Sequence, residues 1–220
     1  GHCHPKIVET LTKQAKKLAT CSRAYDNDQA GPFAELMNKT FGYDKILPSS
    51  AGVESCETAV KLARRWGYVV KGVESDKAEI LFPKGCFWGR SVTAISGCDD
   101  PVRYKGFGPL TPGFPLVEYN NLEALEEKLK NNPNIVAYMV EPIQGEGGVI
   151  MPDEGYLTKA HELLRKYNCL MICDEIQTGL ARTGKMLCSD YEKGFRPDMV
   201  TLGKSLSGGL LPLSVVLADD

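Results

Sequence analysis

One lysine near the end of the chain could act either as a phosphate ligand or as a nucleophile. Lys204 follows an apolar run and precedes a flexible Ser-Gly-Gly stretch, in the segment LGKSLSGGLLP (202–212). A Walker A phosphate-binding loop needs a glycine five positions before the glycine that precedes the lysine. That position holds Asp198, and the residues that follow it are typical of a strand. The segment is therefore not predicted to be a P-loop.

A lysine at the end of a buried strand can instead form an imine with a carbonyl compound. Partial desolvation lowers the pKa of the amine and frees its nitrogen to attack. The alternative for Lys204 is a lysine whose stem packs on the protein while its ammonium reaches water. Taken alone, Lys204 favours that alternative, because lysines are rarely buried without a partner.

A carboxylate ends a second apolar run. Asp174 follows CLMIC (169–173) and precedes EIQTG (175–179). Among apolar neighbours such a carboxylate needs a cationic or N–H partner. The ring nitrogen of pyridoxal phosphate would supply one, because it must stay protonated for the ring to act as an electron sink. The alternative is that Asp174 caps the turn that follows it.

Two loops have residue types that suit a phosphorylated aromatic ligand. SSAGVES (49–55) opens an amphipathic helix, where free backbone N–H groups and the helix dipole attract phosphate, although helix capping by Ser50 explains the same residues. GCFWGR (85–90) sets two aromatic residues beside an arginine. A ring cofactor could stack on one of them, and the arginine could clamp a carboxylate bidentately. The alternative is that at least one aromatic side chain folds back into the core.

Further carboxylates and histidines carry weaker signals. VEPIQGEGGV (140–149) places two carboxylates and an amide in a glycine-rich bend, where they could steer a cationic amine or balance the charge of Arg90. His2 and His4 flank Cys3 ahead of a helix. Such a pair is more often structural than metal-binding, so no metal site is predicted.

The elements that position these residues alternate between short apolar runs and longer amphipathic ones. Strands are predicted at 80–82, 135–140, 170–173, 199–202 and 213–218, and helices at about 5–19, 33–40, 53–70, 90–96, 121–131 and 156–167. The strands are apolar throughout, which is typical of strands covered on both faces. We therefore expect an α/β fold, a three-layer αβα arrangement around a mostly parallel sheet.

In such a sheet the ligands gather at the carboxyl ends of the strands. Glu141, Asp174 and Lys204 each stand where an apolar run ends. The three residues are therefore expected at one edge of the sheet.

Composition limits the remaining classes of function. The chain has 220 residues, 43% hydrophobic and 25% charged, with a net charge of −2, so we expect one globular domain and no nucleic-acid partner. No run of about 18 apolar residues predicts a membrane span. Eight irregularly spaced cysteines favour free thiols in a reducing compartment. The chain begins without methionine and ends after a strand, so we expect a fragment of a longer protein.

Several stretches together resemble the class III, fold-type I pyridoxal-phosphate aminotransferases. They are GHCHP, SSAGVESCETAVKLARRWGY, GCFWGR, VEPIQGEGGV, CDEIQTGLARTGK and PDMVTLGKSLSGGLLPLS. They cover nearly the whole chain in the family's order, and the last two are highly specific. The resemblance implies that residues 1–220 form an incomplete large domain that binds pyridoxal 5′-phosphate. Residues 1–30 either belong to that domain or form an N-terminal segment packed on it.

The resemblance implies a role for each residue around the cofactor. Lys204 would form the Schiff base with it and later carry the proton, and Asp174 would pair with the pyridine nitrogen. Gln177 would hydrogen-bond the ring hydroxyl. Gly52 and Val53 would offer backbone N–H groups to the phosphate, while Phe87 would stack on the ring.

On the substrate side the resemblance implies that Arg90 binds a carboxylate. Glu146 would mask a second arginine that lies outside these 220 residues. Trp88, where many relatives carry histidine, would also contact the substrate. Together with the stretch GFGPLTPGF (106–114), it favours transfer of the δ-amino group of ornithine to 2-oxoglutarate, giving glutamate 5-semialdehyde and glutamate. The alternatives are another class III amine substrate, acetylornithine or 4-aminobutyrate, and a fragment that is inert as it stands.

The resemblance also implies a homodimer, because the active sites of the family form at a dimer interface. We expect a cytoplasmic protein, with the mitochondrial matrix as the alternative. Cys86 and Cys98 bracket the proposed stacking loop, which raises a hypothesis of redox control that spacing alone cannot establish.

Overall fold

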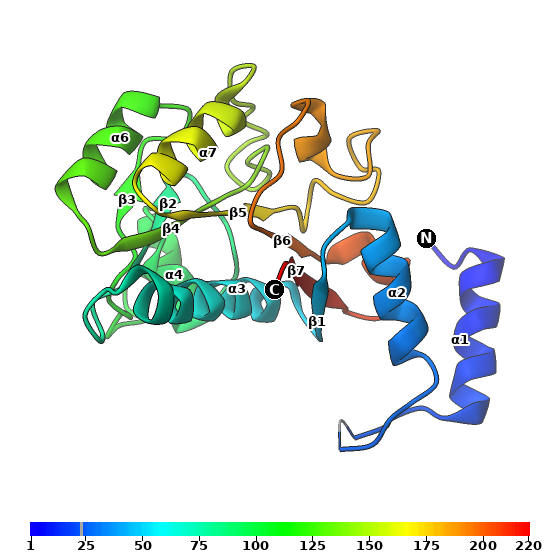
Figure 1. Ribbon diagram of the computed structural model, residues 1–220. Helices are drawn as coiled ribbons and strands as arrows, with labels where there is room; N and C mark the ends of the chain where they lie inside the picture. The colour runs from blue at the N-terminus through cyan, green and yellow to red at the C-terminus, as the bar shows by residue number, and fades with distance from the viewer. Residues whose placement is uncertain (23) are drawn as a thin grey trace.

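A seven-stranded sheet with helices on both faces forms the body of the molecule (Figure 1). The computed structural model describes residues 1–22 and 24–220. The strand order is β1-β7-β6-β5-β4-β2-β3. The strands are β1 (Lys45–Ser49), β2 (Glu79–Pro83), β3 (Leu116–Val117), β4 (Ile135–Val140), β5 (Leu170–Asp174), β6 (Met199–Leu202) and β7 (Ser214–Ala218).

The sheet is mostly parallel, as predicted. Strands β3, β2, β4, β5 and β6 pair in parallel, while β7 runs antiparallel to both β6 and β1. All five predicted strands are present, but the two edge strands were missed. Strand β1 contains Pro48, which lowers its strand propensity and is tolerated because β1 lies at an edge of the sheet. Strand β3 has only two residues, too few to give a periodic signal.

The predicted helices are also present, with shifted ends. They are α1 (Pro5–Lys17), α2 (Ala30–Phe41), α3 (Gly52–Trp66), α4 (Val92–Ser96), α6 (Leu122–Asn131) and α7 (Tyr156–Lys166). Helix α3 continues as a π-helical turn, η1 (Gly67–Lys71). A short helix, α5 (Pro101–Tyr104), and two 3₁₀ turns, η2 (Cys188–Tyr191) and η3 (Lys204–Ser207), were not predicted. None of the described helices is long and apolar enough to cross a membrane.

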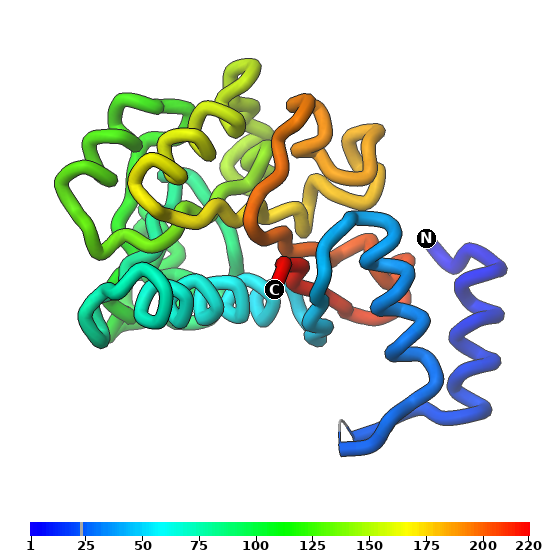
Figure 2. The backbone as a smooth tube through the Cα atoms, viewed as in Figure 1, coloured from blue at the N-terminus to red at the C-terminus, as the bar shows by residue number. Residues whose placement is uncertain are grey.

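The central strands are apolar on both faces because each face is covered. In β4, Val136 and Met139 pack in the core on the α3 side, while Ile135 and Tyr138 pack in the core with α6 and α7. Helix α2 covers the β6–β7 end of the sheet, where Met37 joins a third cluster. Figure 2 shows α1 standing beyond α2, away from the sheet, and α1 buries none of its side chains.

Tyr43 joins the α2–β1 connection to the β5–β6 side of the sheet. Its side chain is 1% exposed, and its hydroxyl donates a hydrogen bond to the carbonyl of Pro197 at 2.8 Å. The guanidinium of Arg196 lies 4.1 Å from the centre of its ring.

Replacing Tyr43 by phenylalanine should lower the free energy of unfolding by about 1 kcal/mol, because the buried Pro197 carbonyl loses its donor. Tyr191→Phe is the matched control. Its hydroxyl also donates to a carbonyl, that of Thr183, but the residue is exposed and water can replace the bond. Urea unfolding of both variants checks this. Equal losses, or no loss for Tyr43→Phe, would contradict it.

Candidate functional site

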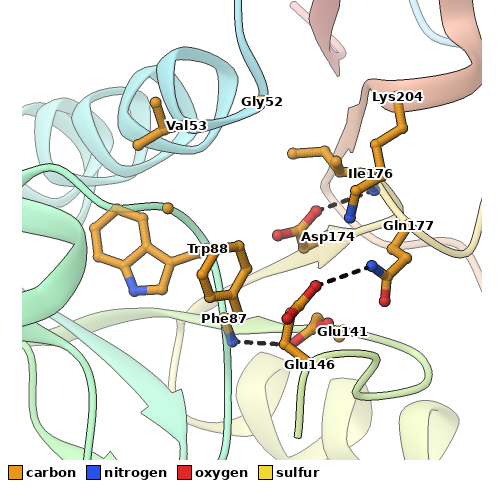
Figure 3. Close-up of a pocket in the computed structure, with 11 residues that line it drawn as sticks. Gly52, Val53, Phe87, Trp88, Glu141, Glu146, Asp174, Ile176, Gln177 and Lys204 are labelled. Atoms are coloured by element: carbon orange, nitrogen blue, oxygen red, sulfur yellow. Dashed lines mark hydrogen bonds between the residues drawn. The ribbon is translucent and has the colours of Figure 1, made fainter. Parts of the chain in front are cut away.

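The carboxyl ends of β4, β5 and β6 bring three charged residues to one pocket, as the parallel sheet predicts (Figure 3). Glu141 follows β4, Asp174 ends β5 and Lys204 follows β6. The pocket has a volume of about 210 Å³. Its lining residues are Gly52, Val53, Phe87, Trp88, Gly89, Glu141, Glu146, Asp174, Ile176, Gln177 and Lys204.

Asp174 is held by hydrogen bonds from three elements. Its Oδ1 accepts from the backbone N–H of Ile176 and from the hydroxyl of Thr201, each at 3.0 Å. The thiol of Cys56, on α3, lies 3.5 Å from Oδ2. The carboxyl group is 5% exposed and therefore has a fixed orientation at the pocket wall.

Burial raises the pKa of Asp174 above its usual range. The Ile176 N–H, the Thr201 hydroxyl, the Cys56 thiol and the charge of Lys204 act in the opposite direction, because each stabilises the carboxylate. A cationic group bound beside Oδ2 would add to these interactions. The predicted need of Asp174 for a cationic or N–H partner is thus met in part by the protein itself.

Lys204 lines the pocket, but its environment differs from the one expected. The residue opens the η3 turn with a left-handed backbone, φ 44°, which is strained for a lysine. Its side chain is exposed, so the predicted partial desolvation is wrong for the described chain. The reason is geometric, since Lys204 lies where this pocket meets a second one that also opens to solvent.

The start of α3 faces the same pocket with free backbone N–H groups. Capping by Ser50, the alternative considered above, is absent, because Ala51 is the N-cap residue and no side chain caps the helix there. The carboxylate of Glu54 turns back to accept from the N–H groups of Ser50 and Ala51, at 2.7 and 2.9 Å. Among the described residues, none accepts from the N–H groups of Gly52 and Val53.

The side chains of Phe87 and Trp88 lie in different environments, one facing the pocket and the other in the core. The Trp88 ring is 5% exposed and stacks on Phe82, with centroids 4.8 Å apart and planes at 13°. It is therefore a core residue with one edge in the pocket wall, as the alternative for this loop expected. Phe87 is half-buried and lines the pocket. Gly89, at φ 147°, lets the loop approach α3, since a Cβ atom there would lie 2.3 Å from Val53.

Gln177 and Glu146 meet across the pocket. The amide nitrogen of Gln177 lies 3.5 Å from a carboxylate oxygen of Glu146 (Figure 3). The contact depends on Gly145, where a Cβ atom would overlap the amide oxygen of Gln177 at 1.3 Å. Gln177 and Glu146 can therefore meet only because residue 145 has no side chain.

Arg90 is not in this pocket. It is exposed and lines an adjoining pocket of about 430 Å³, whose wall also contains Arg103 and Phe107. The guanidinium groups of Arg90 and Arg103 lie 5.9 and 5.1 Å from the centre of the Phe87 ring. Phe87 therefore separates the arginine pocket from the Asp174 pocket.

Three residues that line the pocket were not among the predicted site residues: Gly89, Glu141 and Ile176. Glu141 was noted at a strand end and as one of two carboxylates that could steer an amine or balance Arg90, although a carboxylate that directly follows a fully apolar strand was a usable signal for the site itself. Ile176 was not considered. Its side chain packs on Gly52 and Gly203, and a Cβ atom at those glycines would lie 3.1 and 3.3 Å from it.

The cysteines are all free thiols in the structure. Cys86 is buried, its thiol donates to the carbonyl of Gly97 at 3.2 Å, and burial raises its pKa. Cys98 is half-buried. In the described residues no group of three or more His, Cys, Asp or Glu side chains could hold a metal ion. His4 instead caps α1, accepting from the N–H of Lys6.

The pocket fits a flat, phosphorylated aldehyde with a protonated ring nitrogen. Phe87 offers an aromatic face and Ile176 an aliphatic one. Asp174 presents a buried carboxylate, the start of α3 has unpartnered N–H groups, and Lys204 supplies an amine. These groups match the four parts of pyridoxal phosphate, namely the ring faces, the ring nitrogen, the phosphate and the aldehyde.

Comparison with known proteins agrees with this chemistry. The family profile described as "Aminotransferase class-III" matches residues 1–220. The mitochondrial ornithine aminotransferase of Drosophila melanogaster is 57% identical over 220 residues, which is 100% of this chain and 51% of the relative. The chain thus spans about half the length of that relative.

Two solved structures extend the likeness to the fold. The ornithine aminotransferase of Toxoplasma gondii ME49 superposes with a TM-score of 0.97 at 48% identity, covering 100% of this chain and 52% of that one. An acetylornithine aminotransferase from Elizabethkingia anophelis gives a TM-score of 0.85 at 45% identity, covering 100% and 51%. The family predicted from the sequence is confirmed: the chain belongs to the class-III aminotransferases.

Proposed function

We propose that the protein to which this chain belongs is a pyridoxal-phosphate aminotransferase that moves the δ-amino group of ornithine to 2-oxoglutarate. The observation that carries the proposal is one pocket that joins an amine, Lys204, a buried carboxylate, Asp174, and an aromatic face, Phe87. The 57% identity to a named ornithine aminotransferase supports the substrate. Because the chain spans about half of such relatives, activity and substrates are proposed for the whole protein.

The residues of this chain bind and orient the cofactor. Asp174 holds the protonated ring nitrogen through Oδ2, while its Oδ1 stays fixed by Ile176 and Thr201. The N–H groups of Gly52 and Val53 bind the phosphate at the positive end of α3.

Phe87 covers one face of the ring and Ile176 the other, and the amide of Gln177 donates to the ring hydroxyl. The bound cofactor supplies an electron sink for the carbon that loses a proton.

Lys204 has two tasks, both at Nζ. Nζ would hold the cofactor when it is bound. Nζ would also take the proton from the substrate carbon and return it, acting as general base and acid. Its position two residues beyond the end of the buried β6 keeps it in reach of both pockets that it lines.

Arg90 binds a substrate carboxylate from the adjoining pocket, on the far side of Phe87. Trp88, packed on Phe82 in the core, forms part of the wall of the Asp174 pocket. Glu146, which contacts Gln177 here, pairs with an arginine from the part of the protein outside this chain. Switching that pair would let one site admit either ornithine or a dicarboxylate.

The same proposal covers organisation and location. Residues 1–220 form most of a cofactor-binding large domain, and two copies associate as a homodimer. The partners of the protein are small amino acids and 2-oxo acids. For the compartment, a mitochondrial location gains support over the cytoplasm from the name of the Drosophila relative, which includes the word mitochondrial.

Replacing Lys204 by alanine in the full-length protein should abolish the borohydride-reducible absorbance band that pyridoxal phosphate gives with the wild type. The reason is that the anchoring amine is lost. Lys128→Ala, on the exposed face of α6, is the control and should keep the band. A reducible band in Lys204→Ala would reject the assignment, and no band in the wild type would favour the inert alternative.

Replacing Asp174 by asparagine should lower kcat at least about 100-fold and weaken cofactor binding, because a preorganised charge is lost. Asp198→Asn is the comparison. That carboxylate accepts from the N–H of Met171 at the opposite end of β5, so its loss should affect stability and leave turnover near the wild-type value. Steady-state kinetics and cofactor titration measure both variants. Turnover of Asp174→Asn within three-fold of wild type would contradict the role.

Relative turnover separates ornithine from the other amines. With 2-oxoglutarate as acceptor, kcat/KM for ornithine should exceed that for acetylornithine and for 4-aminobutyrate. Faster turnover of either competitor would reject the substrate while leaving the family assignment intact.

A further inference from the structure

Glu141 is a buried carboxylate that lines the pocket, and the proposed function gives it no role. It follows the last residue of β4, is 6% exposed and lies in the same wall as Asp174 and Lys204. A carboxylate that close to another needs a structural reason, because burial and like charge both oppose its ionisation. The reason is in the backbone around it.

The two oxygens of Glu141 bind two different loops. Oε1 accepts from the backbone N–H of Phe87 at 3.0 Å, and Oε2 accepts from the backbone N–H of Gly145 at 3.1 Å. Phe87 lies in the 84–91 loop between β2 and α4, and Gly145 in the 141–155 bend after β4. Both donors are N–H groups, and the carboxylate offers one acceptor oxygen to each. One carboxylate therefore ties together two walls of the pocket.

No other described residue accepts a hydrogen bond from the N–H of Phe87. The neighbouring anchors of the loop hold other positions. The amide of Gln144 donates to the carbonyl of Lys84 at 2.7 Å, and the N–H of Gly85 donates to Asp99 at 3.0 Å. Trp88 is fixed by its stack on Phe82. The peptide group between Cys86 and Phe87 is held by two side chains: Arg103 donates to the Cys86 carbonyl at 3.3 Å, and Glu141 accepts from the Phe87 N–H. Glu141 is the one of the two that links this peptide group to the Gly145 bend.

We propose that Glu141 is a positioning residue whose carboxylate clamps the Phe87 loop to the Gly145 bend and so holds the Phe87 ring against the bound cofactor. The clamp itself is a property of the chain without any ligand. Only the effect on the cofactor rests on the proposed function.

The groups around Glu141 give the clamp a pH dependence. Burial and the charge of Asp174 raise the pKa of Glu141 to about 7, while the Phe87 and Gly145 N–H groups and Lys204 act against that rise. Tyr119 donates to the Glu141 backbone carbonyl at 3.2 Å and leaves the carboxyl group free. The ionised form accepts both N–H bonds fully, so the clamp is complete above about pH 7 and weakens as the carboxyl group is protonated below it.

Glu141→Gln tests the clamp, because the amide keeps the shape but turns an NH₂ donor toward one of the two N–H groups. In the full-length protein without cofactor at pH 8, we expect amide hydrogen exchange in peptides covering 84–90 and 142–148 to become about ten-fold faster. Glu175→Gln is the matched control. Its buried carboxylate accepts from the N–H groups of Cys188 and Ser189, so it should loosen residues 186–190 and leave 84–90 unchanged.

Unchanged exchange at 84–90 in Glu141→Gln, or equal loosening there in Glu175→Gln, would overturn the clamp. If Glu141→Gln does not fold, the wild type tests the same point. Its protection at 84–90, corrected for the intrinsic exchange rate, should rise between pH 6 and pH 8, and a flat profile would overturn the clamp.

Cofactor affinity tests the second part. The dissociation constant for pyridoxal phosphate in Glu141→Gln, divided by that of the wild type, should be about ten at pH 8 and fall toward one near pH 5.5, where residue 141 is neutral in both. A ratio that stays constant with pH would indicate a purely structural role and overturn the positioning role. A wild type that binds no pyridoxal phosphate would reject the proposed function, while the exchange experiment would still decide the clamp.

Discussion

The cost of burying the Asp174 carboxylate is the constraint on which the rest of the site depends. Three neutral donors hold the group in place: the Ile176 backbone N–H, the Thr201 hydroxyl and the Cys56 thiol. Burial still raises the pKa of the carboxyl group. The protein thus keeps an ionisable group whose charge is not fully compensated by its own donors. A cationic ring nitrogen would complete that compensation, and this is the role proposed for Asp174 toward the bound cofactor.

The parallel sheet is what brings the other groups to Asp174. Because β4, β5 and β6 run in the same direction, Glu141, Asp174 and Lys204 emerge at one edge although long stretches of chain separate them. The start of α3 reaches the same edge, and Gly89 and Gly145 let two loops close around it. The backbone therefore places the four groups of the site: the Phe87 ring, the Asp174 carboxylate, the Lys204 amine and the start of α3.

Much of this could be predicted from the sequence, for identifiable reasons. Runs such as 135–140 are apolar throughout because both faces of the sheet are covered, and that pattern identified the parallel strands and the residues at their ends. Edge strand β1 could not be found, since Pro48 and exposed positions leave no periodic signal. Three features depend on tertiary contacts between distant segments. They are the burial of Trp88 in the core, the exposure of Lys204 and the position of Arg90 in the pocket beyond Phe87. Local residue types do not encode those contacts.

Covalent trapping tests the central claim, that Asp174 and Lys204 form one cofactor site, most directly. The full-length protein is incubated with pyridoxal phosphate, reduced with borohydride and digested, and the labelled peptides are sequenced by mass spectrometry. We expect a single labelled residue, Lys204, and strongly reduced labelling when Asp174 is replaced by asparagine. Labelling spread over other lysines, or labelling of Lys204 that does not depend on Asp174, would contradict it.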